Sequence, residues 1–462
     1  MGLGEAPGTE AWRPRRHRPA PRPEAAPAPA VADRVRVGVL VAIPATAVVL
    51  FGAVEAVHAL PVEIGALLLG AATVLARVRR GERPLPAPRL TLPVLGLAGL
   101  AALQLVPWPG RVPTALGVGF ARPEAALLRS LSVFPSATYV ALLRWLAYAG
   151  FLIAALDVLP RPGAARMALG AVAAFGIVEA TYGIVNLLVG NAHLLWLRRE
   201  VSLLDATGTL VNRNHYAALL ELCVPALLAR HWLARGSRTD ASGLAALTVI
   251  AGTVMGLALL LSHSRAGVVA LVLALTITAT LAPPDTRGRH GRRIVLAVGG
   301  AVLLYGAYVG LEPLLSRFAA LAAAPGDVRT AIWSDTLDLI ADFPITGAGA
   351  GTFEAIFPAY RHATTDQLAY AHAHQDFLEL AAEGGLLAIA LILAAAWAFA
   401  RAIAPALTRR HERSLPLAAL LGALGAVLAH ATVDFPLHIP GLTFLFLLLA
   451  AVTVTVATTT GE

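Results

Sequence analysis

Long apolar stretches recur along the chain, and polar segments rich in arginine separate most of them. Each stretch holds about 17 to 25 residues, enough for a helix that rises about 1.5 Å per residue to cross about 30 Å of hydrocarbon. Strands of a β-barrel would instead be about 10 residues long and would alternate in polarity. The pattern therefore predicts an all-α integral membrane protein.

The apolar stretches predict about twelve membrane-spanning helices. They cover residues 37–57, 62–78, 90–107, 138–158, 165–189, 214–233, 243–262, 266–282, 293–311, 376–403, 415–434 and 439–457. Only His263, Ser264 and Arg265 separate the seventh helix from the eighth, so the count depends most on this short turn. The first stretch is too long for the core of a signal peptide, and we interpret it as an uncleaved anchor.

Composition and charge agree with this reading and add an orientation. Hydrophobic residues make up 57% of the 462 and charged residues only 14%, which excludes a water-soluble fold, where about 25% are charged. All 36 cationic residues are arginine, and 25 of them lie in alternate segments: the N-terminal tail, 77–89, 161–166, 230–238, 287–293 and 401–413. Positive residues accumulate in cytoplasmic loops, so both termini are predicted to be cytoplasmic. The net charge of +8 therefore reflects topology, and we expect no nucleic-acid partner.

Four parts of the chain follow from this topology. Residues 1–34 form a disordered cytoplasmic tail rich in Arg, Pro and Ala, and residues 35–311 hold helices one to nine. Residues 312–375 form a large extracytoplasmic loop, and residues 376–458 hold helices ten to twelve. A smaller outer segment covers residues 190–213. Any chemistry is expected on this outer side, where both polar segments lie.

Arginines on the outer side run against the charge bias and therefore indicate a site. Arg265 lies between two apolar stretches, where its guanidinium needs an anion: either the phosphates of surrounding lipids or a substrate phosphate. Arg329 lies in the first turn of a helix predicted within the large loop, where backbone N–H groups also favour an anion. The alternative for Arg329 is an ordinary solvated surface arginine.

A run of four polar residues opens the helix predicted at 214–233. It consists of Asn212, Arg213, Asn214 and His215. An ordinary helix cap accounts for such a run, because Asn side chains accept hydrogen bonds from the free N–H groups of a first turn. The alternative is that Arg213 belongs to the same anion site as the other outer arginines.

The segment before the tenth predicted helix supplies an acid–base group. His372, His374 and Asp376 lie where the large loop enters the apolar stretch. An imidazole can take a hydroxyl proton near neutral pH, and a carboxylate such as Asp376 can orient it. A helix-capping histidine is the simpler alternative. A zinc site is a further one, with His362 or Asp366 as the third ligand.

Several motifs in order resemble one family of membrane enzymes. They are LQLVPWP at 103–109, NRNHYA at 212–217, SHSRAG at 262–267, R-x3-W at 329–333 followed by FPITGAGAGTF, AHAHQDFLELAAEGG at 371–385 and VDFPLHIPG at 433–441. In this order, within twelve predicted spans, they resemble the O-antigen ligase and Wzy-type polymerase superfamily. The resemblance covers roughly residues 90–445.

The resemblance implies a GT-C-like glycosyltransferase of the bacterial inner membrane that acts on undecaprenyl-diphosphate-linked glycans without a metal or other cofactor. In that family, two arginines bind the donor diphosphate, and a histidine in the large loop is the catalytic base. By motif these are Arg265, Arg329 and His374, with Arg213 as a further pocket residue and His372 as support. His374, Gln375 and Leu378 follow the family pattern of His, then Asn, Ser or Gln, and Leu three residues further on.

Three functional alternatives remain at this point. A ligase transfers the glycan to a final acceptor hydroxyl on a glycan, lipid or protein, whereas a Wzy-type polymerase joins it to a second carrier-linked unit. A transporter or flippase for lipid-linked glycans is the rival from another class, and it typically has internal repeats and charges deep within spans. The main carboxylates inside the predicted spans are Glu179 and Glu221, both within a few turns of a span end.

Overall fold

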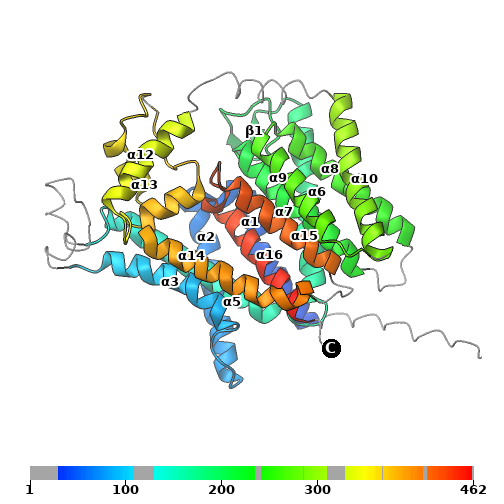
Figure 1. The fold of residues 1–462 in the computed structure, drawn as a ribbon, viewed down its shortest axis with the longest axis horizontal. Helices are drawn as coiled ribbons and strands as arrows, with labels where there is room; N and C mark the ends of the chain where they lie inside the picture. The colour runs from blue at the N-terminus through cyan, green and yellow to red at the C-terminus, as the bar shows by residue number, and fades with distance from the viewer. Residues whose placement is uncertain are drawn as a thin grey trace, which may run out of the picture.

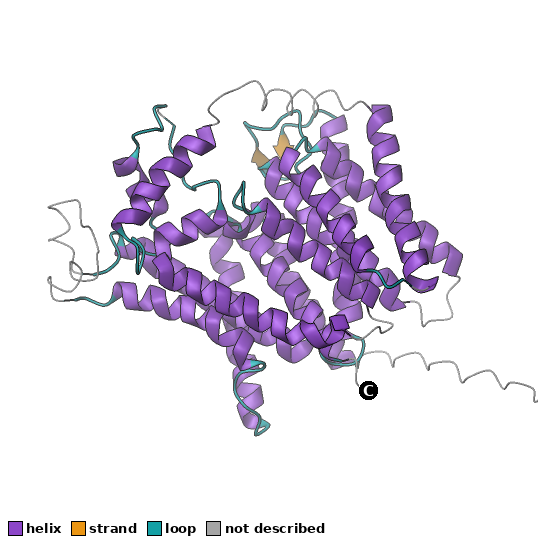
Figure 2. Cartoon of the chain, in the orientation of Figure 1, coloured by secondary structure: helices purple, strands orange, loops and turns teal. Residues whose placement is uncertain are grey.

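The computed structural model describes residues 30–108, 130–234, 241–284, 286–309, 328–366, 368–408 and 414–459. Helices account for nearly all regular structure in these ranges, as Figure 2 shows. The strands among them are β1 (His193–Leu194) and β2 (Leu197–Arg198), which form one antiparallel hairpin. An all-α fold is confirmed for the part of the chain described here.

Each of the twelve predicted segments coincides with a helix. The helices are α1 (Val31–Val49), α2 (Ala56–Arg79), α3 (Pro88–Leu105), α5 (Pro135–Val158), α6 (Ala164–Leu188), α7 (Arg213–Ala234), α8 (Ala241–Leu261), α9 (Arg265–Leu281), α10 (Thr286–Val309), α14 (Asp376–Thr408), α15 (Ser414–His430) and α16 (Pro440–Thr458). Eight of the described helices are long and apolar enough to cross a membrane, and α9 and α15 are shorter apolar helices. The protein is a multi-pass membrane protein, while the count of twelve spans stays a prediction.

The start of the first helix differs from the predicted one. Helix α1 begins at Val31, inside the segment assigned to the disordered tail, while residues 1–29 lie outside the described residues. The large loop contains α12 (Val328–Asp342), α13 (Phe353–Ile356) and the 3-10 turn η3 (Phe357–Tyr360). Asp327 directly precedes α12 in the sequence and is of a residue type that favours a helix cap, but it lies outside the described residues.

Helix α7 lies in the interior of the helical bundle. It contacts α6, α8, α9, α15 and α16 (Figure 1), and most of its side chains are buried. Small residues allow this close packing: a Cβ on Gly176 of α6 would lie 2.5 Å from the Cβ of Cys223 on α7. The first turn of α7, which carries the Asn212–His215 motif, is therefore fixed by helices on several sides.

Helix α14 is broken one third of the way along, where the large loop docks onto it. Gly385 has φ 60° and ψ −160°, so it interrupts the helical hydrogen bonds. The backbone N–H groups of Leu386 and Leu387 instead donate to the carbonyls of Pro344 and Ile345, at 2.9 and 3.2 Å. The turn after α12 thereby supplies the hydrogen-bond acceptors that the helix lacks at its break. These bonds hold the turn next to α14.

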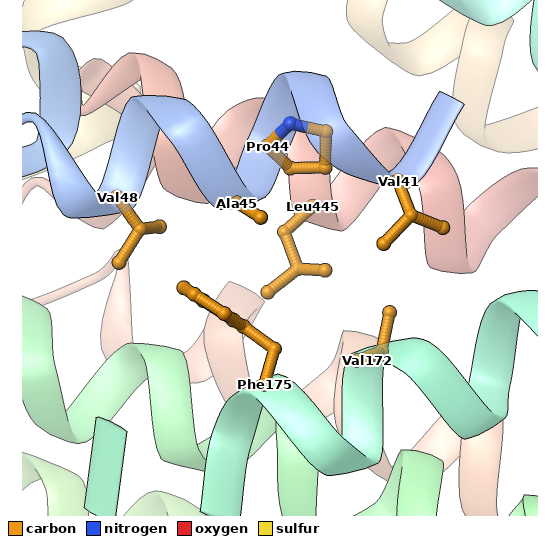
Figure 3. Close-up of a pocket in the computed structure, with 7 residues that line it drawn as sticks. All are labelled: Val41, Pro44, Ala45, Val48, Val172, Phe175 and Leu445. Atoms are coloured by element: carbon orange, nitrogen blue, oxygen red, sulfur yellow. The ribbon is translucent and has the colours of Figure 1, made fainter. Parts of the chain in front are cut away.

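An apolar crevice lies on the other side of the bundle from this turn, between α1, α6 and α16. It has an empty volume of about 220 Å³ (Figure 3). The side chains around it are Val41, Pro44, Ala45, Val48, Val172, Phe175 and Leu445. Because this lining is entirely apolar, the crevice supplies no group for acid–base or anion chemistry.

Candidate functional site

The outer arginines predicted from the sequence line one cleft. It has an empty volume of about 300 Å³, which includes space open to solvent. Its lining consists of Arg213, Asn214, His263, Arg265, Ala266 and Arg329. These residues come from the start of α7, the α8–α9 turn and the first turn of α12, so the fold brings together cations that are far apart in the sequence.

The SHSRAG motif builds one wall of the cleft. Ser264 caps α9, because its Oγ accepts a hydrogen bond from the N–H of Gly267 at 3.1 Å. Arg265 is the first residue of the helix, where the helix dipole presents partial positive charge. Gly267 lets α9 approach α7, since a Cβ there would lie 2.5 Å from that of Ala217. The guanidinium and the helix terminus thus add positive potential at the same place.

Asp205 is a site residue that the sequence did not reveal. It is 3% exposed, and its two carboxylate oxygens bind Arg213 Nη1 and His263 Nδ1, each at 2.8 Å. Arg199 fixes the loop that carries Asp205 by donating to the Asp205 carbonyl and to Thr207 Oγ1, at 3.1 and 3.0 Å. A lone carboxylate in a polar loop forms no sequence pattern, and its partners Arg213 and His263 are 8 and 58 residues away, so no feature of the sequence pointed to it.

Asp434 connects the cleft with the predicted base. It is 1% exposed, and its Oδ2 accepts hydrogen bonds from Asn214 Nδ2 at 2.5 Å and Arg329 Nη2 at 3.3 Å. Arg329 Nη1 also donates to the Val433 carbonyl at 2.7 Å. Burial by itself would raise the pKa of Asp434, but its interactions with His215, Arg329 and His430 and a hydrogen bond from the Phe435 N–H hold this pKa below its ordinary value. The carboxylate is therefore ionised at neutral pH.

His374 lies beside this carboxylate. Its Nδ1 is 4.0 Å from Asp434 Oδ1 and is buried without a hydrogen-bond partner among the described residues. The backbone of His374 has φ 53°, an uncommon conformation for a non-glycine residue. Burial lowers the pKa of His374 below its ordinary value; Asp434 opposes this shift and Arg329 adds to it. The imidazole is thus neutral near pH 7 and able to accept a proton.

His372 has a carboxylate partner of its own. Its Nδ1 lies 2.8 Å from Oε1 of Glu379, and Oε2 of Glu379 accepts a hydrogen bond from the Ala373 N–H at 2.8 Å. Asp376, predicted to orient the histidines, instead accepts hydrogen bonds from Leu437 N at 2.9 Å and from His438. Burial lowers the pKa of His438, but the carboxylates of Glu379 and Asp376 outweigh this effect and raise the pKa to about 10.

The Phe435 ring contacts three of the predicted histidines. Its ring stacks on His372 at 4.3 Å and meets His374 and His215 edge to face at 5.0 and 4.7 Å. His215 is 6% exposed, so it supports the site from within the bundle. Asn212 caps α7, because its Oδ1 accepts from Asn214 N at 2.8 Å. Within this motif, Asn212 therefore caps the helix, whereas Arg213 and Asn214 line the cleft.

Comparison with known protein families identifies part of this site. Residues 249–393 match the family model described as O-antigen ligase. This region is similar to the O-antigen ligase domain. The match confirms the resemblance to the O-antigen ligase and Wzy-type superfamily. A comparison with curated proteins gives no match.

The O-antigen ligase match contains much of the site, and the rest of the chain completes it. Arg265, Arg329 and His374 lie within residues 249–393. Asp205, which binds Arg213, precedes this range, and Asp434 follows it. The cleft and the carboxylate next to His374 therefore depend on segments outside the matched domain.

Chemically, the site combines an anion receptor with a proton acceptor. Guanidinium groups bind the oxygens of phosphates through charge-assisted hydrogen bonds, and a neutral imidazole accepts a proton from a hydroxyl. Among the residues described, no group of three or more His, Cys, Asp or Glu side chains is arranged to hold a metal ion. The zinc alternative with His362 or Asp366 thus lacks a matching cluster in this part of the chain.

Proposed function

We propose that the protein transfers a glycan from an undecaprenyl-diphosphate-linked donor to an acceptor hydroxyl, as an O-antigen ligase does. The reaction would take place on the outer face of the bacterial inner membrane, with both termini in the cytoplasm and twelve GT-C-like spans. We further propose that it needs no metal or other cofactor and inverts the anomeric configuration. The family match supports a ligase or polymerase role in general terms.

The observation that carries the proposal is the convergence of Arg213, Arg265 and Arg329 on one cleft. A lipid-linked diphosphate lies at the membrane surface, with its glycan in water and its chain in hydrocarbon. Its receptor should therefore be a group of arginines at helix ends, below a polar loop, and this is where the three residues lie. Lipid phosphates alone would account for single arginines at the membrane surface and not for three that line one cleft.

The proposed step is a single displacement. The acceptor hydroxyl loses its proton to His374, and its oxygen forms the new bond to the anomeric carbon. The bond between that carbon and the diphosphate oxygen breaks, and the leaving group keeps the electron pair. The arginines of the cleft stabilise the charge on the diphosphate, while Asp434 stabilises the imidazolium of His374. Attack from the face opposite the leaving group inverts the configuration.

Transfer by purified protein in detergent tests this proposal. A synthetic undecaprenyl-diphosphate glycan is incubated with saccharide and peptide acceptors in the presence of a chelator. Released undecaprenyl diphosphate and gel-resolved glycan products are measured for the wild type, Arg265→Ala and His374→Ala. Matched controls are Arg198→Ala and His362→Ala, which remove an exposed arginine and an exposed histidine from the same side of the molecule. We expect release in the wild type and in both controls, and its loss in the two site variants.

Other outcomes select the alternatives. Products of increasing length, with carrier-linked glycan as acceptor, would assign a Wzy-type polymerase. Loss of activity in chelator that added metal restores would contradict the metal-independent mechanism. Absence of release with every donor and acceptor, together with movement of the carrier across reconstituted vesicles, would favour a transporter.

A further inference from the structure

The loop that follows η3 places an aromatic ring and two charged groups next to the proposed base. The ring centroid of Tyr370 lies 6.3 Å from that of His374, with the two rings nearly perpendicular. The guanidinium carbon of Arg361 lies 5.7 Å above the Tyr370 ring, and Asp366 accepts a hydrogen bond from the Tyr370 hydroxyl at 2.6 Å. None of these three residues takes part in the arginine cleft or in the proton step described above.

The three side chains form a fixed arrangement. Arg361 Nη2 also contacts Asp366 Oδ1 at 2.9 Å, and Arg361 Nη1 donates to the Leu368 carbonyl at 2.9 Å. Their side chains remain accessible, with 19% of Arg361 and 30% of Asp366 exposed. The hydrogen bond from Tyr370, with Arg361 nearby, holds the pKa of Asp366 below its ordinary value, so the carboxylate is charged at neutral pH.

The surrounding loop is anchored to α12 and cannot move freely relative to His374. Asp335, which is 1% exposed, accepts hydrogen bonds from the backbone N–H groups of His362, Ala363 and Thr364 at 2.8 to 3.1 Å. Trp333 Nε1 donates to the Ala373 carbonyl, one residue before His374, at 3.1 Å. Helices α12 and α13 lie together beside the start of α14 (Figure 1). These contacts hold both ends of the segment that carries Tyr370 and thereby place its ring next to the base.

We propose that Tyr370, Asp366 and Arg361 form the binding site for the acceptor and that this acceptor is a sugar ring. A sugar offers an apolar C–H face that packs on an aromatic ring and adjacent hydroxyls that bind a carboxylate or guanidinium. Both features are present next to His374. The Tyr370 ring contacts the imidazole, Asp366 binds the Tyr370 hydroxyl, and the Arg361 guanidinium lies over the Tyr370 ring. The diphosphate cleft reaches His374 through Asp434, which binds Asn214 and Arg329, whereas Tyr370 contacts the imidazole ring itself, so donor and acceptor would bind at different places around the base.

This inference rests on the proposed glycan transfer and names its acceptor. It is tested by KM for two kinds of acceptor, a panel of mono- and disaccharides and a serine-rich peptide, with one undecaprenyl-diphosphate donor. The variants are Tyr370→Ala, Tyr370→Phe and Asp366→Asn. Tyr139→Ala is the matched control, because Tyr139 on α5 is 56% exposed. Binding of the saccharides is measured separately by saturation-transfer NMR, which does not depend on turnover.

We expect Tyr370→Ala to raise KM for the saccharide by about tenfold or more and to weaken its NMR signal, with KM for the donor unchanged. Tyr370→Phe keeps the ring and should change KM only slightly, whereas Asp366→Asn should raise it. Transfer to the peptide alone, or an unchanged saccharide KM in Tyr370→Ala and Asp366→Asn, would overturn the acceptor site and leave the proposed transfer standing. Absence of transfer by the wild type to any acceptor would instead overturn the proposed function.

Discussion

At the residue scale, the chemistry depends on one imidazole held beside a buried carboxylate. His374 Nδ1 lies 4.0 Å from Asp434, and Asp434 in turn binds Arg329 and Asn214 of the cleft. One carboxylate thus touches both the proposed proton acceptor and the proposed diphosphate receptor. His372 has a different partner, Glu379, and stacks on the Phe435 ring, which His374 meets edge to face.

Replacement of His374 should therefore cost more than replacement of His372. We expect His374→Ala to lower kcat by a factor of about 10² to 10⁴, the usual contribution of a general base. His372→Ala should leave most of the activity, because this ring stacks on Phe435 and hydrogen-bonds Glu379 but does not take the proton in the proposed step. Release of undecaprenyl diphosphate under saturating donor measures both. An equal loss in the two variants, with both proteins folded, would mean that the proton acceptor is not His374 alone.

The pH dependence gives a second prediction with a definite sign. Burial lowers the pKa of His374, so the neutral base persists below pH 6.5, the ordinary imidazole pKa. We expect kcat/KM to be constant near pH 7 and to fall only when pH drops below this value. Asp434→Asn removes the charge that raises the pKa of His374, so the acidic limb should move to still lower pH, with a smaller maximal rate. A limb that stays in place or moves to higher pH would rule out this role of Asp434.

The sequence predicted some of these residues for physical reasons. Arg265 and Arg329 stood out because they lie on the side predicted to hold few positive residues. This charge bias can be seen in a single sequence, because it extends over the whole chain. Asp205 did not stand out, because its partners Arg213 and His263 are 8 and 58 residues away and only the folded loop brings them together. Asp376 was expected near His374, but the helix turns its carboxylate towards His438.

At the element scale, the break in α14 decides where the large loop sits. Gly385 takes a backbone conformation that side chains disfavour, and a Cβ there would lie 2.4 Å from the Ile345 carbonyl oxygen. The turn at 344–347 is held by this contact, and α12, which directly precedes the turn, packs on α14. The apolar stretch predicted one helix at 376–403, and periodicity alone could not indicate that the chain leaves helical geometry inside it.

Gly385→Ala should therefore destabilise the protein. We expect a loss of about 1–3 kcal/mol from backbone strain, with further cost if the loop is displaced. Thermal unfolding in detergent measures this, and the donor-dependent activity should fall with it. The matched control is Gly99→Ala in α3, where a Cβ meets nothing within 4 Å. Equal melting temperatures of the two variants would show that the break does not hold the loop.

At the scale of the whole molecule, helix positions followed from hydropathy, while their arrangement did not. All twelve predicted segments coincide with helices, because each must satisfy its backbone hydrogen bonds internally in lipid. The central position of α7 depends on contacts with five other helices, which periodicity does not encode. The same holds for the cleft, whose walls come from three separate segments.

The orientation of the bundle can be tested with single cysteines. Cys223 is buried, so it should not react with a membrane-impermeant thiol reagent. Ala363→Cys lies in the large loop and Arg83→Cys in the turn between α2 and α3, and both positions are exposed. We expect labelling of intact spheroplasts at residue 363 and labelling at residue 83 only after the membrane is permeabilised. The reverse pattern would place the proposed site in the cytoplasm.

Direct binding of undecaprenyl diphosphate tests the central claim, that the three converging arginines hold the donor diphosphate while His374 acts in the chemical step. Affinity is measured by native mass spectrometry in detergent for the wild type, Arg265→Ala, Arg329→Ala and His374→Ala, with Arg198→Ala as the control. We expect each arginine variant of the cleft to bind at least about tenfold more weakly, a loss of about 1.4 kcal/mol or more, and His374→Ala to bind like the wild type. Undiminished binding in both Arg265→Ala and Arg329→Ala would contradict the account.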